Sequence, residues 1–320
     1  MVLIQSKVYI LGTLYTIGYL ISTKSNQSLV YKRHNLQTMS VQRGQKLNSL
    51  QHLLPEGLVV SAAWLENRGY SSALRGKYVT NGWLLQPARG IYKRPGAETR
   101  WQHLVISMQS LMHQPVAVGG LSALELQGYG HYVRLGTGHR VYLYTEARLA
   151  KWVREADPSI HFEQRNANKL FKEADIENAV TELPDLTVPA DHTGASHVSG
   201  GLKRFVWGDR EWPMIVSSPE RATLEFLDEI PNRQSFEHAA DLFTGLTDLS
   251  PRRLQKLLER CDSVKATRLF LWFAERYQHT WLKHLDLAEI DIGSGKRVIA
   301  KSGRLDSKYQ ITVPENLNGH

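Results

Sequence analysis

The sequence predicts an α+β protein: a small N-terminal unit of helices and a β-hairpin, then a larger mixed α/β domain with a helical bundle and a C-terminal β-hairpin. Three observations predict it. Residues 55–95 contain two short helical patterns, each opened by a serine and followed by a hairpin pattern. Residues 116–165 mix short β-branched runs with short helical patterns. Beyond residue 218, helical patterns preceded by serine caps lead to a basic C-terminal segment with the alternating pattern of a β-hairpin.

Composition limits the class of protein. At 320 residues and 42% hydrophobic, the chain is long enough for two or three domains. A single cysteine, Cys261, excludes an intramolecular disulfide and a multi-cysteine metal site, which fits a reducing cytoplasm. No run reaches the roughly 18 to 20 apolar residues of a membrane span. The nearest run, residues 8–21, has the apolar stretch of a weak signal peptide but no small-residue cleavage site after it.

Residues 1–38 are expected to be a non-native or flexible extension with little fixed structure. The segment that begins at Met39 leads directly into the first helical pattern of the N-terminal unit. Our hypothesis is that translation starts at Met39 instead of Met1, and the N-terminal mass of the native protein distinguishes the two starts.

The net charge of +8 is concentrated at the front of the chain. Residues 40–100 carry nine Lys or Arg against three Glu, and residues 1–39 carry four against none, which leaves −2 for the remainder. This distribution is typical of a protein whose front contacts a polyanion such as nucleic acid.

Residues 45–97 are interpreted as a winged helix-turn-helix domain that binds DNA. Leucines at spacings of three and four predict a first helix over residues 45–54, and residues 58–60 favour a short strand. Ser61 and Ser71 are placed to cap the second and third helices. Winged folds also serve as protein-docking units, but here pattern and charge agree on DNA.

The third helix is expected to enter the major groove. Leu74 and Tyr78 face the core at 3.6 residues per turn. The opposite side is expected to carry Ser72, Arg75, Gly76 and Thr80. A mid-helix glycine costs about 1 kcal/mol relative to alanine, so Gly76 indicates close approach to a DNA backbone. The Arg75 guanidinium could donate two hydrogen bonds to a guanine. Ser71 and Ser72 are placed to bind a phosphate at the helix N-terminus.

The hairpin after the third helix is interpreted as the wing. Residues 82–85 and 90–93 are the expected strands, and the tip between them offers Arg89. The far strand offers Lys93 and Arg94, so the wing is expected to lie along a minor groove or the sugar-phosphate edge. Three aromatic residues are interpreted as core rather than as groups that stack on bases: Trp64, Trp83 and Tyr92.

Four segments are similar to one protein family: LPEGLVVSAAWLENRGY, SSALRGKYVTNGWLLQPARGIYKRPG, VAVGGLSALELQGYG and PMIVSSPERATLEFLDEI. The chain resembles the AbiEi-type antitoxins of bacterial type IV toxin–antitoxin systems, which act in abortive infection and phage defence. The resemblance covers residues 45–313, and none of its motifs is catalytic. Residues 1–38 have no counterpart in it.

The resemblance implies a transcriptional repressor of its own bicistronic operon, which binds inverted repeats in double-stranded promoter DNA. It also implies that a C-terminal antitoxin domain, residues 101–320, neutralises a nucleotidyltransferase-like toxin without requiring a stable complex. The DNA-contacting positions of the family fall here on the third helix and the wing, at Arg75, Lys77, Arg89, Lys93 and Arg94.

Several elements are expected within residues 101–320. Helices are predicted over 101–113 and from a capping box at Ser122, with strands at 116–118, 140–144 and 161–165. Residues 184–201 read as a loop or hinge, in which His192 and His197 lack the partners of a metal site. Serine caps precede helices that start near residues 219, 236 and 251, and an apolar stripe predicts a long helix over 264–281.

Residues 293–313 are expected to form a basic β-hairpin. Its cations make a possible second surface for nucleic acid: Lys296, Arg297, Lys301, Arg304 and Lys308. A solvated edge hairpin is the equal alternative, because cations also protect strand edges from aggregation.

The chain is not expected to be an enzyme or to need a cofactor or metal. Asp291 with Asp306 and Lys308 has the loose order of a metal-dependent nuclease, but that order is common by chance. The phosphate-loop, esterase and zinc signatures are missing. The alternative function is a winged-helix regulator whose C-terminal domain senses a ligand or dimerises. A nucleotidyltransferase-like gene directly downstream would favour the antitoxin.

Overall fold

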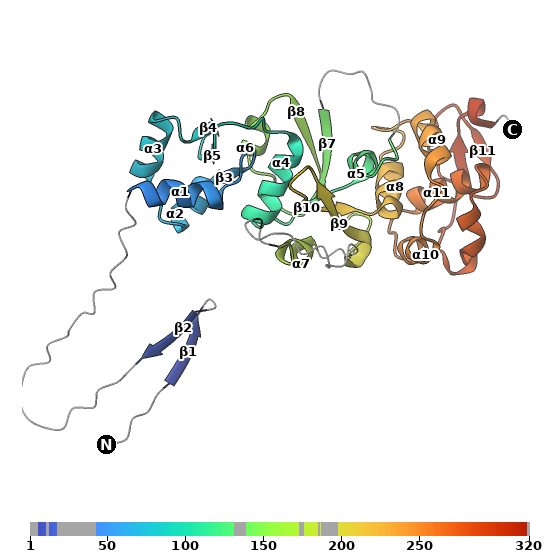
Figure 1. Ribbon diagram of the computed structural model, residues 1–320. Coiled ribbons are helices and arrows are strands. Elements are labelled where there is room, and N and C mark those ends of the chain that lie inside the picture. The colour runs from blue at the N-terminus through green and yellow to red at the C-terminus, as the bar shows by residue number, and fades with distance from the viewer. Residues whose placement is uncertain are drawn as a thin grey trace, which may run out of the picture. The chain divides into compact units, whose positions relative to one another are not determined.

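The computed structural model describes residues 6–10, 13–17, 43–130, 139–172, 176–184, 186 and 198–318. It divides into two compact units, residues 1–46 and 47–320. In the first unit, β1 (Ser6–Ile10) and β2 (Thr13–Ile17) pair as an antiparallel hairpin (Figure 1). This hairpin lies within the extension expected at residues 1–38.

The helices and strands that follow have the order of a winged helix-turn-helix. They are α1 (Arg43–Leu53), β3 (Val59–Ser61), α2 (Ala62–Asn67), α3 (Ser72–Thr80), β4 (Leu85–Ala88) and β5 (Ile91–Lys93). The expected serine caps are present: the Ser61 hydroxyl accepts from Trp64 N at 3.1 Å and the Ser71 hydroxyl from Leu74 N at 3.4 Å. The α+β class and the N-terminal winged helix-turn-helix are therefore confirmed.

The wing begins later than the sequence predicts. The three strands have the order β3-β5-β4. Arg89 and Gly90 join β4 to β5, and Gly90 has a φ of 77°, which favours glycine. The expected strand at 82–85 is wrong because the amides of Trp83 and Leu84 both donate to Tyr78 O, at 2.9 and 3.2 Å. These two residues therefore complete the end of α3, and the strand starts at Leu85.

A five-stranded mixed sheet forms the centre of the chain, in the order β8-β7-β6-β10-β9. Its strands β7, β8, β9 and β10 are labelled in Figure 1. Its strands are β6 (Ala117–Val118), β7 (His139–Tyr144), β8 (Ile160–Arg165), β9 (Leu202–Trp207) and β10 (Trp212–Ser217). The pairs β7–β8 and β6–β10 are parallel, and the others are antiparallel. The short α6 (Trp152–Glu155) lies between β7 and β8 in the chain, and α7 (Ile176–Thr181) follows β8.

The helix expected at 101–113 is divided in two. It consists of α4 (Trp101–Ile106) and a π-helical segment, Ser107–Leu111. The Ser107 hydroxyl donates to His103 O at 2.6 Å and accepts from Val59 N at 2.8 Å, and such side-chain insertions distort the regular helical pattern. Gln109 is fully buried and binds Val116 O and both backbone groups of Ile215.

The helix α5 (Gly120–Leu126) starts at Gly120, so the capping box expected at Ser122 is wrong. Ser122 lies inside the helix, and its hydroxyl accepts from Tyr142 N at 3.1 Å. Gly119 precedes the helix. A Cβ at this position would lie 2.4 Å from both a Glu225 carboxylate oxygen and the Tyr144 ring. The tight contact between helix and sheet therefore requires glycine at this position.

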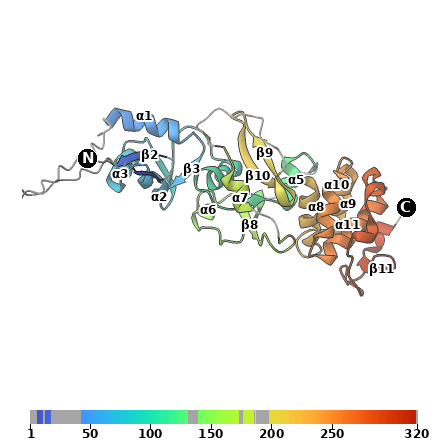
Figure 2. The same cartoon turned by 90° about the horizontal axis from the view of Figure 1, so that it is seen from below.

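Four helices form the bundle shown in Figure 2: α8 (Pro219–Asp228), α9 (Phe236–Gly245), α10 (Pro251–Glu259) and α11 (Val264–Arg276). The serine cap expected before α10 is wrong, because the Ser250 side chain makes no cap hydrogen bond and its amide donates to the Glu220 carboxylate at 2.8 Å. Phe243, Phe270 and Phe273 are fully buried and pack their rings together in the core of the bundle. The long helix ends at Arg276 rather than near 281, because Gln278 adopts a left-handed φ of 49°. A 3₁₀ turn at Thr280–His284 follows.

The C-terminal segment contains a shorter hairpin than expected, β11 (Arg304–Asp306) with β12 (Ile311–Val313). Residues 297–300 run beside β12, where Arg297 N donates to Gln310 O at 2.8 Å and Ala300 N to Thr312 O at 3.1 Å. Three further 3₁₀ turns are Ser199–Gly201, Leu287–Glu289 and Glu315–Asn318. None of the described helices has the length and apolar character needed to span a bilayer.

Candidate nucleic-acid interface

The exposed side of α3 is small and polar. Its exposed residues are Ser71, Ser72, Ala73, Gly76, Lys77 and Thr80. Among the described residues, and apart from its chain neighbours and the backbone of its own helix, no atom lies within 4 Å of the position where a Cβ of Gly76 would stand, so the helix backbone is open there. The Thr80 hydroxyl donates to Gly76 O at 3.1 Å, and the Ser71 hydroxyl is held as the helix cap. A flat helix side with few long side chains permits close approach of a duplex backbone.

Arg75 is buried, so its expected position on the exposed side is wrong. Its side chain donates to Tyr70 O at 2.7 Å, lies 3.7 Å from the Glu66 carboxylate and covers the Tyr92 ring at 5.8 Å. Residues three apart share one side of a helix, and Arg75 therefore shares the inward side with Tyr78. This arginine attaches α3 to the preceding turn and to β5.

Lys77 and Arg89 are the exposed cations of the third helix and the wing tip. Within the described residues, no ion pair joins either side chain to a carboxylate. Both are therefore available for phosphates, whose contacts supply most of the sequence-independent affinity for DNA.

Lys93 and Arg94 are half-buried and already bonded to the protein. Lys93 Nζ donates to the Thr99 hydroxyl at 2.9 Å. Arg94 pairs with Glu56 at 3.0 Å and donates to Gln51 O at 3.1 Å, near the end of α1. A cation at the C-terminal end of a helix stabilises its unpaired carbonyls. Arg94 therefore holds the wing against α1, and Lys93 binds the segment that follows the wing.

The three aromatic residues expected in the core differ in burial. Trp64 is buried and Tyr92 is half-buried. Trp83, however, is 42% exposed; it follows the end of α3 and makes a T-shaped contact with Tyr78, with ring centroids 5.3 Å apart. Leu85 at the start of the wing is 43% exposed. The wing therefore presents apolar as well as cationic side chains.

His103 connects the winged unit to the central sheet, a role that the sequence does not reveal. Its ring packs edge-on against Trp207 and Trp212, at centroid distances of 4.9 and 5.7 Å. Its Nδ1 accepts from Arg100 N at 2.9 Å, and a Cβ at Gly57 would lie 2.7 Å from the ring. A cavity of about 440 Å³ lies beside this contact.

Acidification is expected to weaken the fold through His103. Burial, with help from Arg100 and Lys93, lowers the pKa of His103 to about 4. The unfolded chain binds a proton near pH 6.5 and the folded chain only near pH 4, so stability present at pH 7 is lost as the pH falls. We expect the free energy of unfolding to be about 2 kcal/mol smaller at pH 5 than at pH 7 because of this group. Urea titrations at both pH values measure the difference.

The control for this pH effect is His103→Asn, whose side-chain oxygen can still accept from the Arg100 amide. The variant should lose most of the difference between pH 5 and pH 7. An unchanged difference in the variant would assign the effect to other groups.

The cations of the possible second surface lie on residues 296–308, and all five are exposed. Lys308 pairs with Glu275 of α11. The two aspartates of the nuclease-like order hold turns: Asp291 accepts from Gly293 N at 2.7 Å and Asp306 from Tyr309 N at 2.8 Å. His192 and His197 lie outside the described residues. In the part of the chain that the structure describes, no group of three His, Cys, Asp or Glu side chains could hold a metal ion.

Two protein-family models match the chain. One is described as the N-terminal domain of the AbiEi antitoxin, a transcriptional regulator, and matches residues 43–135. The other is described as a transcriptional regulator, the AbiEi antitoxin of a type IV toxin–antitoxin system, and matches residues 138–314. A search of curated proteins finds no match. The matched ranges extend from α1 to β12.

Proposed function

The chain belongs to the AbiEi antitoxin family of type IV toxin–antitoxin systems, a family of transcriptional regulators, and from this premise we propose that it represses its own operon. In this proposal, the winged helix-turn-helix at residues 45–97 binds inverted repeats in double-stranded promoter DNA. The observation that carries the proposal is the open side of α3, with exposed cations on the helix and at the wing tip.

The predicted site residues take two roles in this proposal. Five are exposed and contact DNA directly: Ser71, Ser72, Lys77, Thr80 and Arg89. Arg75, Lys93 and Arg94 act as positioning residues, because their side chains already bind the protein. Specific recognition then depends on short polar side chains and on the helix backbone, while the cations supply general affinity.

We further propose that residues 101–320 form the antitoxin domain, which neutralises a nucleotidyltransferase-like toxin in the cytoplasm without catalysis, cofactor or membrane. A stable complex with the toxin is not required. The basic residues 296–308 are a second candidate contact with nucleic acid, since all five cations are exposed.

Replacing Gly76 by alanine is expected to separate folding from DNA binding. Alanine favours a helix interior by up to about 1 kcal/mol over glycine, and none of the described residues obstructs its Cβ. The fold should become more stable, whereas operator affinity should fall, because the methyl group stands between the helix and the duplex. Thermal unfolding and DNA titration of the same preparation measure both effects. Unchanged operator affinity would place α3 away from the duplex.

A growth assay tests the function as a whole. The chain is co-expressed with the gene directly downstream, and a promoter reporter records repression. Rescue of growth together with repression supports the proposal. Repression without rescue would favour the alternative, a winged-helix regulator with a ligand-sensing or dimerising C-terminal domain.

A further inference from the structure

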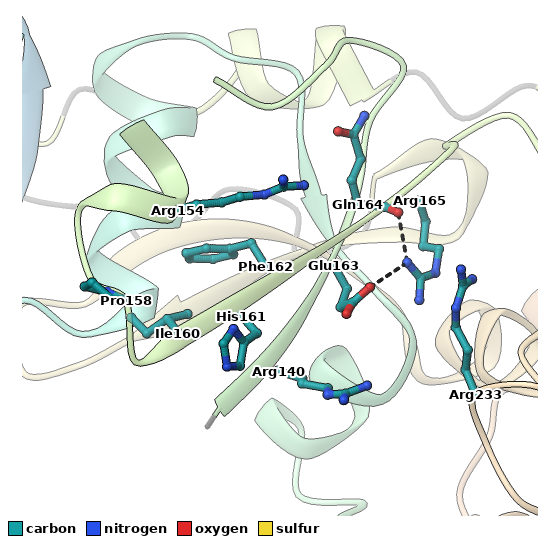
Figure 3. A pocket seen from close by; sticks show the side chains of 10 residues that line it. All are labelled: Arg140, Arg154, Pro158, Ile160, His161, Phe162, Glu163, Gln164, Arg165 and Arg233. Atoms are coloured by element: carbon teal, nitrogen blue, oxygen red, sulfur yellow. Dashed lines mark hydrogen bonds and ion pairs between the residues drawn. The ribbon is translucent and has the colours of Figure 1, made fainter. Parts of the chain in front are cut away.

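A cavity lies along the terminal strand of the central sheet. Among the described strands, β8 pairs only with β7. The cavity measures about 620 Å³, and all six residues of β8 line it (Figure 3). Successive side chains of a strand point to opposite faces. A cavity lined by every residue of β8 therefore runs along the open edge of the strand and not over one face.

The backbone at this edge retains hydrogen-bonding groups. Arg165 O accepts from Thr145 N at 3.0 Å and so faces the β7 side. Backbone groups of alternate residues in a strand face the same side, so those of Phe162 and Gln164 face the cavity. The Gln164 carbonyl is occupied by the Arg165 guanidinium at 2.9 Å. Within the described residues, three backbone groups have no hydrogen-bond partner and are left for a ligand: the N–H of Gln164 and the N–H and C=O of Phe162.

The cavity is positively charged. Four arginines line it against one glutamate: Arg140, Arg154, Arg165 and Arg233, with Glu163. Arg165 is neutralised by Glu229, at 2.8 and 2.9 Å, and by Glu163 at 3.3 Å. Arg140 and Arg154 are exposed, and no ion pair joins either of them to another described residue. Figure 3 shows Arg154 on one side of the strand, and Arg140 with His161 on the other.

We propose that the open edge of β8 binds an extended, acidic segment of a partner protein, which adds to the sheet as a sixth strand. A peptide offers N–H and C=O groups in alternation and so matches both the carbonyl of Phe162 and the amides of the edge. Its side chains point alternately to the two faces, where acidic groups meet Arg154 on one side and Arg140 on the other. An ionised phosphodiester group offers only acceptors, so the phosphate itself has no donor for the Phe162 carbonyl.

The probe is a fluorescent peptide of glutamate and valine, roughly eight residues long, with glutamates facing both sides. Its affinity for the full chain is measured by anisotropy. Methylating the amides of alternate residues leaves one peptide edge able to pair, whereas methylating every amide removes both edges without changing the charge. We expect the first peptide to bind and the second to lose binding. Amide exchange at Phe162 and Gln164 should slow when the unmethylated peptide binds.

Protein variants test the charge. The double variant Arg140→Gln with Arg154→Gln should weaken peptide binding about tenfold. Arg148→Gln, an exposed arginine outside the cavity, should leave it unchanged. Promoter binding should be the same in all these proteins, so failure of this proposal is distinct from failure of the proposed function.

Three results would overturn the proposal. Equal binding of all methylated peptides would show that the peptide binds by charge alone, without backbone hydrogen bonds to β8. Tripolyphosphate or a single-stranded oligonucleotide that displaces the peptide, without protecting the two amides, would assign the cavity to a phosphate-bearing ligand. No peptide binding at all would mean that the arginines only protect the edge from aggregation.

Discussion

Replacing Glu225 by alanine is expected to lower the free energy of unfolding by about 3 to 5 kcal/mol. Glu225 and Arg221 pair at 2.7 Å, and their side chains are 0% and 1% exposed. The carboxylate also accepts from the Ser217 hydroxyl at 3.0 Å and from Gly120 N at 2.8 Å. Its removal leaves the buried Arg221 charge without a carboxylate and a buried amide without an acceptor, and both are costly.

Urea unfolding of the full chain measures this loss. The matched control is Arg233→Gln, which breaks an ion pair at the same spacing of four residues; the Arg233 side chain is 56% exposed and Glu229 keeps its pair with Arg165, so the change should cost less than about 1 kcal/mol. A loss of similar size in both variants would show that the buried pair contributes no more than a surface pair. Glu225 lies in α8, within one of the segments that resemble the family. Its contacts indicate that this segment serves to pack α8 against α5 and the sheet.

Replacing both Lys77 and Arg89 by glutamine is expected to lower affinity for any duplex by roughly 50-fold at 0.1 M salt. Each cation that neutralises a phosphate contributes about 0.9 to the slope of log affinity against log salt, so the slope should fall by about two. The loss should be equal on operator and random DNA, because phosphate contacts carry no sequence information. Titrations at several salt concentrations measure both quantities.

The control for this double variant removes the same charge from the C-terminal bundle. Arg252 and Lys256 are exposed on α10, and their replacement by glutamine should leave the salt slope unchanged. Equal losses in the two double variants would mean that net charge alone sets the affinity. No loss in the first would place the DNA interface elsewhere on the protein.

The elements of the winged unit could be predicted because their signals are local. Ser61, Ser71, Ser218, Ser235 and Ser263 accept from amides three residues ahead, so each helix start is encoded within four residues. The predicted beginning of the wing is wrong although its cause is local too. Tyr78 O binds the amides of Trp83 and Leu84, and this closure of the helix end competes with strand formation.

The candidate site was predicted less well than the fold. The sequence places Arg75, Lys93 and Arg94 among the DNA contacts, and the structure shows each of them bonded to the protein. A cationic residue near a predicted interface is compatible with either role, and only the position of its partner separates them. For Arg94, two of the partners lie 38 and 43 residues away in the chain.

The sequence by itself determined the element types, the concentration of positive charge at the front and the family, because periodicity, caps and composition are properties of short segments. The tertiary structure alone decided which cations are free, which are buried and which strand has an open edge. These depend on contacts between residues far apart in the chain, such as Arg94 with Glu56 or His103 with Trp207. The residue type can be read from the sequence, but the availability of a side chain to a partner is set by what packs against it.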